Sequence, residues 1–127
     1  MRALERELGF VGSQTGDPVA TIYFGGGTPS LVPPDAIGAF VRRVGQVVTL
    51  LPGAEITLEA NPGTVDEPTL RDVRRAEVNR LSIGMQSADT GELRLFARRH
   101  DVDDVRRTMA LARRAGFANL NLDLIYG

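Results

Sequence analysis

The sequence contains no cysteine and only one histidine among its 127 residues. The absence of cysteine excludes disulfides, thiolate zinc sites and any cysteine-ligated iron–sulfur cluster held by this chain alone. No apolar run approaches the length of a membrane-spanning helix. The opening stretch MRALERELGF is charged and amphipathic, and it lacks the apolar middle of a signal peptide. These absences predict a cytoplasmic protein with no membrane span.

The chain also lacks an excess of charge of either sign. Its net charge is -1, with 24% charged and 43% hydrophobic residues. A near-neutral balance provides no basic surface for nucleic acid, so we expect no nucleic-acid partner. The apolar content is sufficient for the core of one domain at most.

Two hydrophobic periods alternate along the chain. Residues 19–24, 55–62, 80–87 and 119–127 have the apolar runs or the period-two alternation of strands. The intervening segments have helical spacing, with apolar residues at Ile37, Phe40, Val41, Val44 and Val48 in the first, and with further helices over 64–78, 90–97 and 102–115. Strands joined by helical crossovers predict an α/β fold with parallel strands and right-handed connections.

Signals for helix ends accompany this pattern. Thr64 and Glu67 have the spacing of a capping box at the start of the helix over 64–78. Asp101 is a second candidate cap, with Asp104 at the third helical position. Gly116 is expected to end the last helix.

Unusual residues occur where the predicted strands end. Gly25–Gly27 follow the first strand, Glu59 and Gln86 lie at the ends of the second and third, and Asp123 lies within the fourth. Ligands of parallel α/β proteins bind at the carboxyl ends of strands, so these residues predict one shared site. Each also has a purely structural explanation. The glycines could form a turn, Glu59 could cap a helix or pair with Arg75, Gln86 could bond loop backbone, and Asp123 could anchor a loop.

These residue types suit recognition of a small polar molecule. Glycines let a ligand approach the main chain, and a carboxylate such as Glu59 can accept both hydroxyls of a ribose. The stretch GGGTPS lacks the lysine of a P-loop and the spacing of a dinucleotide fingerprint. The residues by themselves therefore predict an α/β ligand site without specifying a reaction.

Several ordered motifs resemble one family. IYFGGGTPS, EANPGTVD, NRLSIGMQS, ARRH and NLDLIYG are similar to the central part of the radical S-adenosylmethionine (SAM) proteins that comprise oxygen-independent coproporphyrinogen III oxidase and the related haem chaperone. The resemblance extends from about residue 19 to the end of the chain. SIGMQS and ARRH resemble the haem chaperone branch more closely than the oxidase branch.

The resemblance implies a SAM site and assigns its residues. The glycine-rich strand end would contact the methionine part of SAM, the strand-end glutamate would bind the ribose, and the remaining positions would complete the pocket. The implied SAM-binding residues are Gly26, Gly27, Thr28, Glu59, Gln86, Arg98 and Asp123. No catalytic residue and no metal ligand is assigned. His100, beside two arginines, is more simply a capping or surface residue than a haem ligand.

The resemblance also implies a fold and a departure from it. The expected fold is a sector of a partial (βα)6 TIM-like barrel, with residues 1–17 as the remnant of a preceding helix, residues 18–127 as βα units and no second domain. In the family a [4Fe-4S] cluster, bound by cysteines upstream of the glycine loop, cleaves SAM to a radical. This chain cannot bind that cluster, so we expect it to be inactive alone. Glu77 is a smaller departure, because related sequences often have glycine there.

Two alternatives accompany this interpretation. The chain could be a non-catalytic module that binds SAM, haem or a partner, or an unrelated α/β enzyme that binds phosphate. Haem or a porphyrinogen would be the partner of the intact parent protein. A sector of a barrel has open strand edges, which predicts marginal stability or self-association of the isolated chain.

Overall fold

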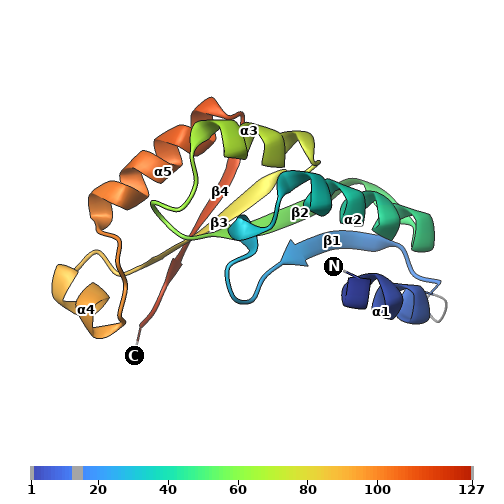
Figure 1. The fold of residues 1–127 in the computed structure, drawn as a ribbon, viewed down its shortest axis with the longest axis horizontal. Coiled ribbons are helices and arrows are strands. Elements are labelled where there is room, and N and C mark those ends of the chain that lie inside the picture. Colours follow the sequence, from blue (N-terminus) through green and yellow to red (C-terminus); the bar gives the residue numbers. More distant parts are fainter. Residues whose placement is uncertain (1, 13–15, 127) are drawn as a thin grey trace.

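The computed structural model describes residues 2–12 and 16–126, and Figure 1 shows their arrangement. Four strands alternate with helices along the chain. The elements are α1 (Arg2–Gly12), β1 (Val19–Phe24), the 3-10 helix η1 (Pro29–Leu31), α2 (Pro34–Val47), β2 (Leu50–Ala60), α3 (Glu67–Arg75), β3 (Arg80–Gln86), α4 (Thr90–Leu95), α5 (Val102–Arg114) and β4 (Asn119–Leu124).

The strands form one sheet in the order β1-β2-β3-β4, and every neighbouring pair is parallel. The predicted α/β class is therefore confirmed. Strand β2 begins at Leu50, earlier than predicted, because its first residue pairs with Val19 before a register shift in β1. The later, regular part of the pairing sets Ile22 against Ile56 and Phe24 against Leu58.

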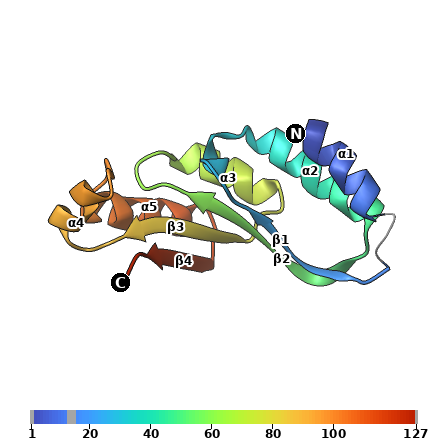
Figure 2. The same ribbon diagram turned by 90° about the horizontal axis from the view of Figure 1, so that it is seen from below.

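Helices α2, α3 and α5 lie on one side of the sheet, as Figures 1 and 2 show. The apolar core is between these helices and the sheet. It contains Ile37, Val41, Ile56, Leu58, Leu70, Val73, Ala76, Val78, Leu81, Ile83, Ala112, Ala115 and Phe117. The other side of the sheet has no helix over it within residues 2–12 and 16–126 (Figure 2). No helix in these ranges is long and apolar enough to cross a membrane.

The two predicted helix caps have different outcomes. Asp101 and Asp104 form the capping box at α5, in which each carboxylate accepts the backbone N–H of the other residue, at 2.8 and 3.0 Å. The predicted box of Thr64 and Glu67 is wrong. The cap of α3 is Asp66, whose Oδ1 accepts the N–H of Thr69 at 2.9 Å.

Pro68 explains where α3 begins. A helix capped at Thr64 would place Pro68 at its fourth position, where the first intrahelical N–H donor is needed, and proline has none. Capping at Asp66 places Pro68 in the first turn, where no donor is required. Thr64 instead donates its hydroxyl to the carbonyl of Asn61 at 2.7 Å.

The turns after α3 and α5 need the left-handed backbone region. Gly116 ends α5 with φ of 96°, as predicted, and Glu77 follows α3 with φ of 73°. A residue with a Cβ is sterically destabilised in this backbone region, and glycine is not. The sequence therefore has an unfavourable residue at the turn where its relatives were expected to have glycine.

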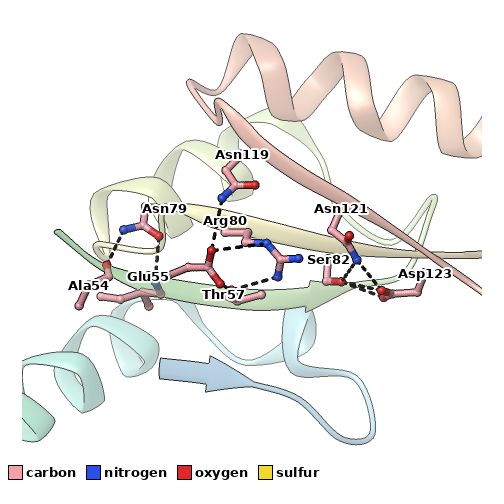
Figure 3. Close-up of polar contacts among 10 residues, drawn as sticks. Ala54, Glu55, Thr57, Asn79, Arg80, Ser82, Asn119, Asn121 and Asp123 are labelled. Atoms are coloured by element: carbon pink, nitrogen blue, oxygen red, sulfur yellow. Dashed lines mark hydrogen bonds and ion pairs between the residues drawn. The ribbon is translucent and has the colours of Figure 1, made fainter. Parts of the chain in front are cut away.

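Asn79, which directly precedes β3, binds the middle of β2. Its Oδ1 accepts the N–H of Ile56 and its Nδ2 donates to the carbonyl of Ala54, both at 2.8 Å (Figure 3). The backbone of β2 pairs with β3 only from Thr57 and Arg80 onward. The backbone N–H of Asn79 also donates to the carbonyl of Ile56 at 2.9 Å, so its side-chain amide adds two further bonds to the backbone pairing of β2 and β3.

Candidate functional site

The face of the sheet that no described helix covers carries polar side chains. They alternate with the core residues along the strands, so period-two alternation places them together. They are Tyr23 on β1, Glu55, Thr57 and Glu59 on β2, Arg80 and Ser82 on β3, and Asn119, Asn121 and Asp123 on β4. Figure 3 shows most of them in contact on this face.

One group of contacts lies toward the amino-terminal ends of the strands. Arg80 is 3.7 Å from Glu55 between Nε and Oε2, and it donates to the hydroxyl of Thr57 at 3.3 Å (Figure 3). Asn119 donates to the same Glu55 oxygen at 3.4 Å. The polar atoms of this group bind one another, so we assign the group a structural role.

A hollow of about 150 Å³ lies at the carboxyl-terminal end of the same face. It is lined by Gly27, Glu59, Ala60, Asn61, Ser82, Gly84, Gln86, Arg98 and Asp123. The predicted residues Gly27, Glu59, Gln86, Arg98 and Asp123 are therefore brought together. Gly26 and Thr28 do not line this hollow. They line a separate one of about 280 Å³, together with the core-side residues Phe24, Val32 and Ile37 and with Leu4, Gly25 and Pro29.

Glu59 is held by two donors from β1 and the loop after it. The hydroxyl of Tyr23 donates to Oε1 at 2.8 Å, and the N–H of Gly26 donates to Oε2 at 3.1 Å. Pairing of Glu59 with Arg75, an alternative from the sequence, is not found, because Arg75 bonds Asp72 at 2.7 Å. The hydrogen bond to Glu59 is the main cause that raises the pKa of Tyr23, with burial adding to it.

Asp123 is also held in place. Both of its carboxylate oxygens lie 2.9 Å from the hydroxyl of Ser82, and Oδ1 accepts from Asn121 at 2.7 Å (Figure 3). Ser82 and Asn61 are lining residues that sequence reasoning missed. The sequence signal that could have identified Ser82 is its position on the polar side of an alternating strand, two residues before Gly84.

Arg98 reaches the hollow from the segment between α4 and α5. Its Nε is buried and has no hydrogen-bond partner among the described residues. Arg98 also lines a second hollow, with Arg99 and His100, whereas Arg99 does not line the first one. Arg98 as a whole is half-buried and lines the hollow, where its guanidinium is the cationic donor beside the carboxylates of Glu59 and Asp123.

His100 fixes the segment that carries Arg98. Its Nε2 lies 3.0 Å from the carbonyl oxygen of Met85, near the end of β3. With that carbonyl as acceptor, the ring nitrogen is the donor. This contact agrees with the structural interpretation of His100 made from the sequence.

Comparison with protein families identifies the chain. The model of the radical SAM superfamily matches residues 2–127. The chain belongs to the radical SAM superfamily. Within it, the chain is 43% identical over 112 residues to the "Heme chaperone HemW" of Escherichia coli (strain K12), a match that covers 88% of this chain and 30% of that protein.

Other relatives agree. The "Radical S-adenosyl methionine domain-containing protein 1, mitochondrial" of Mus musculus is 45% identical over 109 residues, covering 86% of this chain and 25% of that protein. The solved structure of coproporphyrinogen III oxidase (HemN) from Escherichia coli, described as a radical SAM enzyme, superposes with a TM-score of 0.82 and 31% identity. That match covers 99% of this chain and 29% of the solved chain, which confirms the expected radical SAM barrel fold. The chain thus spans between a quarter and a third of these relatives.

Members of the radical SAM superfamily use two cofactors, an iron–sulfur cluster and SAM. An iron–sulfur cluster needs cysteine thiolates, and the sequence has none. Within residues 2–12 and 16–126, no group of three or more histidine or acidic side chains could hold a metal ion. The polar hollow has a cationic side chain, Arg98, and two carboxylates, Glu59 and Asp123, among its lining residues.

Proposed function

We propose that this chain binds SAM in the hollow at the carboxyl-terminal end of its sheet. The observation that carries the proposal is the convergence of Glu59, Gln86, Arg98 and Asp123, which come from three strands and from the segment before α5, on one polar hollow. Convergent polar groups at the carboxyl ends of parallel strands are expected where a small polar ligand binds.

Each side chain then has a role in binding. Glu59 accepts the ribose hydroxyls, and Arg98 donates to the ligand through its guanidinium group. Asp123 and Gln86 supply further polar contacts. Gly26, Gly27 and Thr28 border the methionine part, where the absence of Cβ atoms at the two glycines leaves the main chain accessible. At about 150 Å³ the hollow is smaller than a typical ligand pocket of about 300–1,000 Å³, so it would hold only part of SAM.

The biological setting is a further part of the proposal. By analogy with the haem chaperones and with coproporphyrinogen III oxidase, we propose that the parent protein acts in haem or porphyrin metabolism. SAM in the superfamily supplies a radical when it is bound beside a cluster. Because this chain lacks the cysteines for that cluster, the role we assign to it is to bind and orient SAM, and we derive no radical step.

Isothermal titration calorimetry with SAM tests the proposal. Arg98→Gln removes the guanidinium, and Arg94→Gln is its matched control, because Arg94 is an exposed arginine of the neighbouring α4 that lines no part of the hollow. A charge-assisted hydrogen bond contributes about 1.5–3 kcal/mol, so we expect Arg98→Gln to weaken binding by about 10- to 100-fold. Arg94→Gln should bind as the unsubstituted chain does.

Two results would contradict the proposal. One is a folded chain that does not bind SAM at all. The other is equal affinity in the Arg98→Gln and Arg94→Gln variants. Binding of inorganic phosphate with an affinity above that of SAM would instead support the alternative of a phosphate-binding α/β protein.

A further inference from the structure

Tyr23 and Glu59 come from neighbouring strands and meet on the open face. In the parallel register, Tyr23 pairs with Thr57, so Glu59 lies two residues further along β2 on the same side of the sheet. The phenol reaches across to Oε1 at 2.8 Å, while the N–H of Gly26 binds Oε2 at 3.1 Å. Both carboxylate oxygens are thereby fixed before any ligand is present.

Gly25 makes room for this contact. Gly26 and Gly27 have positive φ angles of 85° and 64°, which explains why they are glycines, but Gly25 does not. A Cβ on Gly25 would lie 2.7 Å from Cε1 of Tyr23 and 3.1 Å from Oε1 of Glu59. The first glycine of the motif is therefore required by the packing of the phenol against the carboxylate, since any side chain there would displace one of them.

We propose that Tyr23 is a positioning residue that holds Glu59 in the orientation that accepts the vicinal hydroxyls of a ribose. This inference rests on the proposed SAM site. A carboxylate oxygen has room for a second donor beside the one it already accepts, so the bonds from Tyr23 and Gly26 orient Glu59 without blocking it. Because the side chain of Glu59 is already oriented, ligand binding does not carry the entropic cost of ordering it.

The phenol keeps its proton over the range in which binding is measured. Its pKa is raised above 10.0, chiefly by the hydrogen bond to Glu59, and the negative charges of Glu59 and Asp123 act in the same direction. Tyr23 is therefore a donor throughout neutral pH, although about half of its surface is exposed. The hydroxyl, and not the ring, is the part on which the proposal depends.

Tyr23→Phe removes only that hydroxyl, and Tyr126→Phe is the matched control, because the other tyrosine of the chain is 96% exposed. Binding is measured with SAM, adenosine and 2′,3′-dideoxyadenosine. Loss of one oriented hydrogen bond predicts affinities for SAM and adenosine that are about 2- to 10-fold lower in Tyr23→Phe. Affinity for 2′,3′-dideoxyadenosine should not change, because it has no hydroxyls for Glu59.

The outcomes separate the two proposals. If the unsubstituted chain binds none of these compounds, the SAM site and the role of Tyr23 are both wrong. If it prefers adenosine to the dideoxy compound and Tyr23→Phe keeps the same preference and affinity, the role of Tyr23 alone is wrong. An equal loss for all three compounds would also overturn it, since general damage to the site does not distinguish hydroxyls.

A titration tests the contact without any ligand. In the Tyr126→Phe background only Tyr23 contributes a phenolate absorbance, so its pKa can be followed directly. Adding Glu59→Gln removes the carboxylate, whose hydrogen bond and negative charge both raise this pKa, so the pKa should then fall toward 10.0. No change in the Tyr23 titration would mean that the hydrogen bond to Glu59 is not formed.

Discussion

Glu77 offers a prediction in which replacement by glycine stabilises the protein. Its backbone has φ of 73° at the end of α3, and no described residue contacts its exposed side chain through a hydrogen bond or ion pair. A residue with a Cβ pays about 1–2 kcal/mol in this region. Glycine avoids that cost but loses about 0.5–1 kcal/mol through the greater freedom of the unfolded chain. Glu77→Gly should therefore raise the free energy of unfolding by about 0.5–1 kcal/mol.

Urea denaturation and thermal melting provide the assay, with an expected rise in Tm of about 2–5 °C. Ala110→Gly is the control, because Ala110 is exposed in the interior of α5 and glycine there should destabilise by about 1 kcal/mol. The same replacement is thus expected to act with opposite signs at the two positions. Destabilisation by Glu77→Gly would refute the assignment of steric cost to this turn.

Three further predictions concern stability and association. Asp101→Ala should lower the free energy of unfolding by about 0.5–2 kcal/mol in urea denaturation, because it removes the cap of α5. The pKa of Asp104 is lowered by the Asp101 N–H and then by Arg107, and that of Glu67 is lowered by Arg114 and then by Arg71. The contribution of these two carboxylates to the stability of the fold should be complete above about pH 5 and should decline as the pH falls through the depressed pKa values. Asp104→Asn should reduce this pH dependence in denaturation curves recorded between neutral and acid pH. The open edges of β1 and β4 predict a sedimentation coefficient that rises with protein concentration, whereas a constant value would exclude self-association.

The elements and their order could be predicted because local patterns determine them. The βα order predicted that Glu59 and Asp123 would lie near one shared rim at the carboxyl ends of parallel strands, and the Asp101 cap required only neighbouring residues. The start of α3 was predicted wrongly, although Pro68 was a local signal that argued against a cap at Thr64.

The tertiary contacts of the site could not be predicted in the same way. The bond between Tyr23 and Glu59 joins residues 36 positions apart, and its existence depends on the register between β1 and β2. The position of Arg98 at the hollow depends on how the segment before α5 packs, with His100 bonded to Met85. Neither the register of a parallel pair nor the packing of a loop follows from periodicity alone.

The amide of Asn79 has a consequence for how this site can evolve. A shift of one residue between β2 and β3 would exchange the polar and apolar faces of β3, so that its core leucine and isoleucine positions would face the open side. Asn79 opposes that shift where β3 begins, whereas the residues of β3 that line the hollow are Ser82, Gly84 and Gln86. Asn79 thus stabilises the alignment of β2 and β3, whereas other residues line the hollow. Substitutions at the rim of the hollow can therefore change ligand specificity while the two strands keep their alignment.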